Sequence, residues 1–319
     1  MLNLIGLMEL VRGLINLQKQ STGCVATIGN FDGIHLGHQA IIERVIVKAK
    51  SLGLPACVLV FEPHPKEFFM GENCPPRLTC FREKYHRLNL LGVDKLVVLQ
   101  FNQTIRQMKA RDFVLHILLD RLQVKHLVIG DDFQFGHQRQ GNYQLLCEMA
   151  QPHYTLEPTP SIVIDHERVS STLIRQALAN NEFAKVSRLL GREYTISGRV
   201  GYGQQIGRTI GFPTANVAVK RKKIALTGVF LVKCIWQQDG KDKVAWGAAN
   251  CGKRPTVNGC TERLEVHLFG VSQELYGIEL AVEFKAQIRQ EIKFNSLTEL
   301  QAQIKQDINQ ANQLINQFK

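Results

Sequence analysis

The order of apolar runs and helix-period segments constrains the fold of this chain more than any other feature. From residue 22 to about 190 the two kinds of segment alternate, as strands and helices do in parallel β-α-β units with right-handed crossovers. The sequence therefore predicts an α/β half built on a parallel sheet. The expected strands are Cys24–Ile28, Ala56–Phe61, Lys95–Leu99 and His126–Ile129, and the expected helices are Gly37–Leu52, Phe81–Leu91, Ala110–Leu122 and Tyr143–Ala150.

The pattern changes after Gly191, where short alternating segments rich in β-branched residues begin. Turn residues separate them at intervals typical of an antiparallel barrel, and an apolar stripe with helical spacing marks Ser296–Lys319. A chain of 319 residues is long enough for two domains. We therefore expect an α/β domain at residues 1–188, followed by an antiparallel β-barrel with a terminal helix at 189–319. The expected barrel strands are Tyr194–Val200, Gly228–Trp236, Val244–Ala249, Leu264–Phe269 and Glu279–Ile288.

Composition disfavours several classes of protein. The eight cysteines include no Cys-x-x-Cys pair, which disfavours a zinc ribbon or a redox pair. No window approaches about 18 consecutive apolar residues, and Glu9 and Arg12 interrupt the apolar start, so neither a membrane span nor a signal peptide is expected. We expect a cytoplasmic protein with reduced thiols. The net charge of +11 suits nucleic acid, acidic membranes or polyanionic small molecules, but the basic residues are dispersed and form no recognition pattern.

A segment rich in glycine and histidine joins the first expected strand to the first expected helix. It reads Gly29-Asn30-Phe31-Asp32-Gly33-Ile34-His35-Leu36-Gly37-His38. Glycines let the backbone approach phosphate, and a helix start offers unpaired N–H groups to an anion. Two histidines three residues apart share one face of a helix, so the segment predicts a triphosphate site. The simpler alternative is a junction in which Asp32 caps the helix and the histidines are exposed.

Three further segments follow expected strands or open a helix. They are Phe61-Glu62-Pro63-His64-Pro65, Gly130-Asp131-Asp132-Phe133 and Ser170-Ser171-Thr172-Leu173-Ile174-Arg175. Open α/β sheets gather ligands at the carboxyl ends of their strands, so we expect these segments to serve one site. In the alternative interpretation the phenylalanines are core residues, Ser171 is only a helix cap and Arg175 is solvated.

Together these segments resemble the FAD synthetase branch of the adenylyltransferase superfamily, which carries His-x-Gly-His. The resemblance implies a Rossmann-like domain that transfers AMP from ATP to FMN, giving FAD and pyrophosphate. The implied catalytic residues are His35, His38 and Arg175. The implied nucleotide-binding residues are Gly29, Asn30, Phe31, Asp32, Gly37, Asp132, Ser170, Ser171 and Thr172, and the implied flavin-binding residues are Phe61, Pro63, His64 and Phe133. The family often has Asn where this chain has Asp132, so binding there through charge or through a hydrogen bond stays open.

A second glycine-rich segment, residues 201–216, opens the barrel half. Its four glycines suit either a flap over phosphates or ordinary hairpin turns, and it lacks the Lys-Ser/Thr of a Walker A loop. Thr214 and Asn216 supply hard oxygen atoms, the ligands that Mg²⁺ prefers. On an expected strand Glu265 shares a face with Arg263 and His267. Taken alone, it reads as a solvent-facing carboxylate.

The run Gly211-Phe212-Pro213-Thr214-Ala215-Asn216 is similar to the riboflavin kinase signature, and residues 249–256 and 264–269 resemble later motifs of that family. The resemblance implies phosphorylation of riboflavin to FMN by ATP. It implies Glu265 as the catalytic base for the 5′-hydroxyl, and Mg²⁺, bound with ATP, on Thr214 and Asn216. The implied nucleotide-binding residues are Gly201, Gly203, Gly207, Arg208 and Gly211, and the implied flavin-binding residue is Phe294.

The two resemblances cover the chain from about Met8 to the terminal helix and are those of prokaryotic bifunctional riboflavin kinase/FMN adenylyltransferases. Met8 begins a segment like the usual family start, so we expect that translation can begin there. The implied partners are riboflavin, FMN, FAD and ATP, with weak self-association allowed and with neither nucleic acid nor membrane. Two alternatives stay open. One is an enzyme with a single working domain, and the other is a flavin- or RNA-binding regulatory module on an inactive scaffold.

Overall fold

The computed structural model describes residues 7–18, 22–203, 210–256 and 259–318, and the side chains of residues 253–261 are not described. Contacts between Cα atoms divide the chain into two compact units. The first comprises Met1–Pro75 and Phe81–Ser170, and the second comprises Pro76–Cys80 and Ser171–Lys319. The boundary expected between residues 188 and 189 stays a prediction, and it falls in the last turn of α8 (Phe183–Leu190).

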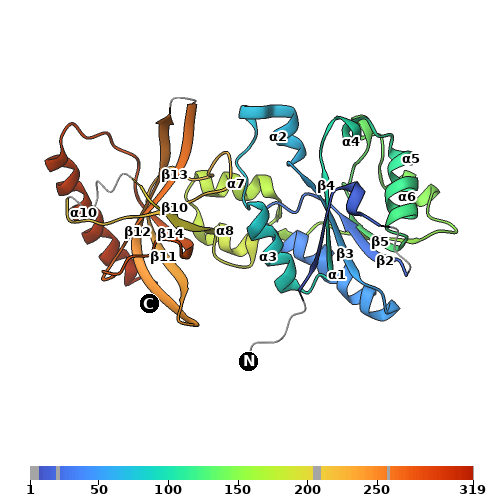
Figure 1. Cartoon of the computed structure of the whole chain (residues 1–319), viewed down its shortest axis with the longest axis horizontal. Helices are drawn as coiled ribbons and strands as arrows, with labels where there is room; N and C mark the ends of the chain where they lie inside the picture. The colour runs from blue at the N-terminus through green and yellow to red at the C-terminus, as the bar shows by residue number, and fades with distance from the viewer. Residues whose placement is uncertain (1–6, 19–21, 204–209, 257–258, 319) are drawn as a thin grey trace. The chain divides into compact units, whose positions relative to one another are not determined.

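Six parallel strands form the sheet of the first unit, in the order β1-β4-β3-β2-β5-β6 (Figure 1). The chain winds outward from β2 to β3 and β4 and then crosses to β5 on the other side of β2. Open α/β sheets bind ligands where the winding reverses, outside the carboxyl ends of the strands. The expected parallel sheet is confirmed. Its strands are β1 (Glu9–Arg12), β2 (Cys24–Ile28), β3 (Ala56–Glu62), β4 (Lys95–Gln100), β5 (Val124–Gly130) and β6 (Thr155–Thr159).

Helices cover both faces of this sheet, because alternate side chains of each strand point to opposite faces. Val58 and Leu96 pack in a cluster with α1 and α3, whereas Leu59 and Val97 pack with α5, η3 and α6. The helix expected at Ala110–Leu122 is α5 continued by the π-helix η3. The bounds are α1 (Leu36–Leu52), α2 (Pro65–Met70), α3 (Phe81–Leu91), α4 (Gln103–Gln107), α5 (Ala110–Phe113), η3 (Val114–Arg121) and α6 (Tyr143–Glu148), with single turns η1 (Leu14–Asn16), η2 (Gly71–Asn73) and η4 (His137–Arg139) and a hairpin of β7 (Val163–Ile164) and β8 (Glu167–Arg168).

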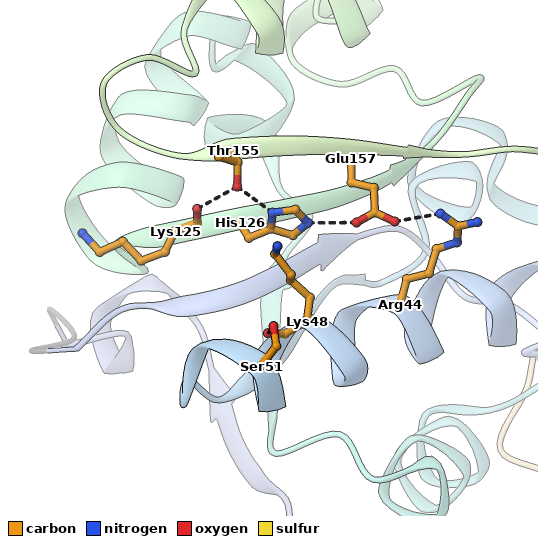
Figure 2. A network of polar contacts seen from close by, with 7 residues as sticks. All are labelled: Arg44, Lys48, Ser51, Lys125, His126, Thr155 and Glu157. Carbon is orange, nitrogen blue, oxygen red and sulfur yellow. Dashed lines mark hydrogen bonds and ion pairs between the residues drawn. The ribbon is translucent and has the colours of Figure 1, made fainter.

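A buried histidine ties the edge strand β6 to β5, and β6 is tied in turn to α1 (Figure 2). His126 lies 2.6 Å from the Thr155 hydroxyl through Nδ1 and 3.2 Å from the Glu157 carboxylate through Nε2. Arg44 on α1 donates to the other Glu157 oxygen at 2.7 Å. Burial lowers the pKa of His126, the bond to Glu157 opposes that shift, and Lys48 lowers it further. Burial would raise the pKa of Glu157, but its hydrogen bonds with Arg44 and His126 outweigh burial and lower it.

Six antiparallel strands of the second unit close into a barrel, in the order β10-β13-β12-β11-β14-β9. Phe230 and Phe284 are fully buried in it, with ring centroids 5.6 Å apart. The strand expected at Val244–Ala249 is the middle of a longer strand, because β11 and β12 form one long hairpin whose turn residues, Asp239 and Gly240, both have positive φ. The expected barrel is confirmed. Its strands are β9 (Thr195–Gly201), β10 (Ala215–Val217), β11 (Gly228–Gln238), β12 (Lys241–Thr256), β13 (Gly259–Leu268) and β14 (Glu279–Arg289).

Helices α8 and α10 (Leu297–Ile315) pack against this barrel, and α7 (Ser171–Ala179) packs on α8. The expected terminal helix is α10, whose Ala311 joins the outward-facing Val229 and Leu231 of β11 in one apolar cluster. Helix α7 precedes α8, where the Phe183 ring lies 5.9 Å from the Phe230 ring. In the described parts of the chain, no helix is long and apolar enough to cross a membrane.

Two arginines hold the segment Pro76–Cys80 in the second unit. Arg175 on α7 donates from Nε to the Pro76 carbonyl at 2.6 Å, and Arg221 donates from Nη1 to the Leu78 carbonyl at 3.1 Å. Leu78 is fully buried. A short piece of the α/β sequence therefore completes the structural unit of the barrel.

Candidate active sites

The loop after β2 makes a tight turn into α1. Phe31 and Ile34 are buried and adopt positive φ angles of 47° and 41°, which are uncommon for residues with a side chain. His35 caps the helix, since its Nδ1 accepts a hydrogen bond from the backbone N–H of His38 at 3.3 Å. The alternative in which Asp32 caps the helix and the histidines are exposed is therefore wrong, because Asp32 is buried in the turn before the cap.

The two histidines form a stacked pair. Their ring centroids are 3.6 Å apart and their planes differ by 17°, which confirms that they share one face. A Cβ on Gly37 would lie 3.3 Å from the His35 ring, so glycine leaves room for this arrangement. Burial, the neighbouring His35 and the Lys84 ammonium, in that order, hold the pKa of His38 well below its usual value. Its Nδ1 is enclosed with no hydrogen-bond partner among the described residues.

Lys84 is a cation near this pair that sequence reasoning missed. Its side chain is 2% exposed, and Nζ lies 3.9 Å from the Glu62 carboxylate at the end of β3. A lysine within a helical pattern is usually solvated, and no sequence signal marks this one as buried. Its charge adds positive potential around His38.

A cavity of about 670 Å³ opens beside the carboxyl ends of β2, β3 and β5. Gly29, Asn30 and Asp132 form part of its polar wall, and Asn30 Oδ1 is buried with no partner among the described residues. Apolar cavities of this size with few polar groups are typical of ligand sites. The structure brings the predicted residues Phe61, His64 and Phe133 to this cavity, together with Phe69, Phe101, Phe113 and Phe135.

Several predicted residues of this site lie elsewhere. Phe31 is 2% exposed and packs in the core, and neither Pro63 nor the histidine pair belongs to the cavity wall. Thr172 lies in the first turn of α7, which begins at Ser171, directly after Ser170. Their parts in nucleotide binding, like that of Arg175, stay predictions.

Asp132 has a cationic partner that sequence reasoning missed. Its carboxylate lies 2.8 Å from the guanidinium of Arg168 on β8, which also reaches Asp131 at 3.4 Å. The Asp132 side chain is 66% exposed, so the ion pair is solvated and weak. Arg168 offsets the negative charge beside a site expected to hold phosphates. The sequence signal was its place two residues before Ser170.

A second cavity, of about 330 Å³, lies on the outer face of the barrel beside α10. The structure brings Thr214, Asn216, Glu265 and Phe294 together in its wall. The expected alternation of β13 is confirmed, because Leu264, Val266 and Leu268 are buried. The other face of the strand contributes Arg263, Glu265 and His267 to the cavity.

The predicted glycines stand close to the same cavity. Gly201 is paired with Asn216 across β9 and β10, and a Cβ on Gly203 would coincide with the Asn216 carboxamide. Gly211 has a φ of 84°, which favours glycine. The predicted Gly207 and Arg208 lie outside the described residues.

Neighbouring side chains fix the groups of this second cavity. Arg263 Nη1 lies 3.6 Å from the Glu265 carboxylate. His267 Nδ1 donates to the Pro213 carbonyl at 2.8 Å, which holds the turn before Thr214. Sequence reasoning placed Arg263 and His267 on the face of Glu265 but assigned them no function.

The predicted flavin-binding residue Phe294 stands beneath an arginine. The Arg289 guanidinium carbon lies 5.7 Å from its ring centroid. Arg289 in turn makes two hydrogen bonds, of 2.8 and 2.9 Å, to the carboxylate of Asp307 on α10. The ring at the cavity wall is therefore held from both β14 and α10.

The oxygen atoms of this cavity suit Mg²⁺. Thr214 and Asn216 offer neutral oxygen ligands beside the Glu265 carboxylate, and Mg²⁺ in such sites keeps several waters and binds substrate phosphates. The described residues contain no cluster of three or more His, Cys, Asp or Glu side chains able to hold a metal. A metal bound together with ATP fits this donor set better than a resident ion held by protein alone.

Family models match both halves of the chain. Residues 17–173 match the FAD synthetase model and residues 190–315 match the riboflavin kinase model. A bifunctional riboflavin kinase/FMN adenylyltransferase from Haemophilus influenzae is 45% identical over 310 residues, which are 97% of this chain and 100% of that protein. This chain belongs to the bifunctional riboflavin kinase/FMN adenylyltransferase family.

Further relatives support the membership of this chain in the bifunctional riboflavin kinase/FMN adenylyltransferase family. Members from Pseudomonas fluorescens and Escherichia coli K12 are 46% and 42% identical, each over 94% of this chain and 96% of the relative. A crystal structure described as a macrolide-efflux protein from Streptococcus pneumoniae is 27% identical, with a TM-score of 0.80 over 96% of this chain and 99% of that one. The fold is therefore shared over 96% of this chain.

Proposed function

We propose that the two cavities divide the two reactions of the family between them. Riboflavin is phosphorylated to FMN by ATP in the barrel cavity. The aromatic cavity, with the histidine loop, transfers AMP from ATP to FMN and releases pyrophosphate. The meeting of Thr214, Asn216 and Glu265 in one cavity supports the first assignment most strongly. As a member of this family the chain is both a kinase and an adenylyltransferase. We place it in the cytoplasm.

In the kinase reaction Glu265 takes the proton of the terminal riboflavin hydroxyl. The hydroxyl oxygen attacks the γ-phosphorus of ATP, the new O–P bond forms, and the bond to the ADP oxygen breaks in line. Mg²⁺ bound with ATP offsets the phosphate charge, and Thr214 and Asn216 are the residues that would hold it. Arg263, 3.6 Å from the carboxylate, keeps Glu265 turned into the cavity.

In the adenylyl transfer a phosphate oxygen of FMN attacks the α-phosphorus of ATP. That oxygen is already ionised, so the reaction needs no base, and catalysis consists of positioning and charge stabilisation. The flavin ring lies among the phenylalanines of the 670 Å³ cavity. His35 and His38 donate hydrogen bonds to the phosphates.

The first prediction separates the two reactions. Incubation with riboflavin, ATP and Mg²⁺, followed by chromatography, should yield FMN and then FAD from the unmodified protein. His38→Ala should yield FMN alone, with adenylyl transfer slowed by roughly 100-fold or more. Glu265→Ala should yield neither, because the base is lost.

The control supplies FMN directly to Glu265→Ala, which should then form FAD at the normal rate. An unmodified protein that makes no flavin phosphate would refute the proposed function. FAD formation lost in Glu265→Ala even with added FMN would show that this substitution acts on folding rather than on the kinase step.

A further inference from the structure

Three polar side chains stand in one row across the kinase cavity. Asn216 of β10 pairs with Glu265 of β13, and Glu265 pairs with Asn250 of β12. Directly opposed residues of antiparallel strands point to the same face, with Cβ atoms about 4.5–5.5 Å apart. All three line the 330 Å³ cavity. Glu265 is therefore flanked by an asparagine on each side.

Asn250 differs from its neighbours in having an enclosed oxygen without a partner. Its Oδ1 is buried and accepts no hydrogen bond from the described residues. Buried carbonyl oxygens are nearly always paired, and leaving one unpaired costs free energy. An enclosed acceptor in the wall of a cavity therefore indicates a donor on the ligand.

The chemistry of the row limits what that donor can be. An ionised Glu265 and the Asn250 carbonyl are both acceptors, and one hydroxyl carries a single proton, so two hydroxyls are needed to satisfy both. The substrate of the proposed kinase reaction, riboflavin, carries several hydroxyls along its ribityl chain and no cationic group. A neutral chain with neighbouring hydroxyls fits these acceptors.

We propose that Asn250 binds a second hydroxyl of the ribityl chain of riboflavin. Glu265 receives the terminal hydroxyl, and Asn250 Oδ1 accepts a hydrogen bond from a hydroxyl further along the chain. Asn250 thereby fixes the position of the ribityl chain along the cavity, so that its terminal oxygen meets the γ-phosphate. This inference rests on the proposed kinase function and assigns a specificity residue to it.

The test compares riboflavin with the analogue whose ribityl chain is replaced by an unbranched hydroxypentyl chain. The analogue keeps the reacting hydroxyl and lacks the others. Asn250→Ala should lower kcat/KM for riboflavin by roughly 10- to 100-fold, because an acceptor that pairs with the substrate is lost. For the analogue the same substitution should change kcat/KM by less than about threefold, because there is no hydroxyl to lose.

Asn216→Ala is the matched control, since it removes the same side chain on the other side of Glu265. As a metal ligand Asn216 serves both substrates, so its loss should lower kcat/KM for both by the same factor. Equal losses for both substrates in Asn250→Ala would overturn the proposal, and so would no loss for either.

A measurement on the unmodified protein keeps the test decisive if Asn250→Ala fails to fold. The unmodified protein should prefer riboflavin to the hydroxypentyl analogue by at least about tenfold in kcat/KM, and equal use of both would overturn the proposal. Failure to phosphorylate riboflavin at all would instead refute the kinase function on which the inference rests.

Discussion

At the scale of single residues, Gly203 and Asn216 compete for one space. A Cβ at position 203 would coincide with the Asn216 carboxamide, so Gly203→Ala must displace the side chain proposed to hold Mg²⁺. We expect the rate of riboflavin phosphorylation to fall by roughly tenfold or more, since small displacements of positioning groups are costly. Adenylyl transfer to added FMN should stay unchanged. Initial rates of both reactions on one preparation would measure this.

A double variant shows whether the effect passes through Asn216. If it does, Gly203→Ala with Asn216→Ala should be no slower than Asn216→Ala alone, because interacting positions are not additive. Effects that simply multiply would contradict the explanation.

A second residue, His126, makes the stability of the first unit depend on pH. Burial keeps its pKa below the usual value in the folded chain, whereas the unfolded chain protonates it near pH 6.5. The unfolded state therefore binds more protons below that pH, and the free energy of unfolding falls as pH drops from about 6.5 toward the lower folded pKa. Between pH 7.5 and 5.5 the free energy of unfolding should fall less in His126→Gln than in the unmodified protein, with a difference of about 1 kcal/mol or less.

The measurement is urea unfolding at several pH values, with His116→Gln as the matched control on the exposed face of η3. The control should keep the pH dependence of the unmodified protein. An unchanged dependence in His126→Gln would instead assign the effect to other groups.

At the scale of elements, sequence periodicity predicted what depends on neighbours along the chain. Alternation in β13 predicted that Glu265 lies on the face opposite to that of the buried Leu264. The spacing of the two histidines predicted that His35 and His38 share one face. The alternative that made Asp32 the helix cap was wrong, and neither interpretation named His35 as the cap, because histidine is not among the usual capping residues. The cap became visible only with the hydrogen bond from the His38 backbone to His35 Nδ1.

Contacts between elements could not be predicted in the same way. Lys84 lies on α3 and is buried near Glu62 of β3, and Asn250 meets Glu265 only through the pairing of β12 with β13. Both contacts depend on which strands and helices become neighbours in space. Patterns within a short stretch of sequence do not reveal those neighbours. The sequence thus predicted several of the segments that border each cavity, but not the side chains contributed by other elements.

At the scale of the whole molecule, one family match ends at residue 173, before α8, and the other begins at residue 190, the last residue of α8. Phe183 packs on the fully buried Phe230, so we propose that α7 and α8 fold with the barrel. A fragment of residues 171–319 should therefore be more stable than one of 189–319. Burying a large apolar side chain contributes about 1.5–3 kcal/mol, so the shorter fragment should melt roughly 5 °C or more lower.

Thermal unfolding of the two fragments beside the full chain provides the measurement. Both fragments lack Pro76–Cys80, so the loss of its bond to Arg221 affects them equally. Arg175 is present only in the longer fragment, where it loses its bond to Pro76, so the difference in melting temperature is a lower limit. Identical melting temperatures would support the boundary expected at 188 instead.

The row of Asn216, Glu265 and Asn250 also limits how this barrel can change during evolution. Removing one residue from β13 ahead of Glu265 would turn the carboxylate into the apolar interior and bring a leucine to the surface, because facing alternates with every residue. Only insertions or deletions of two residues keep the Glu265 side chain on the same face of β13. Even these move Glu265 away from Asn216 and Asn250, its partners on the neighbouring strands. Length variation among descendants of this chain should therefore gather at the Asp239-Gly240 hairpin tip, while the strands of the site vary by substitution alone.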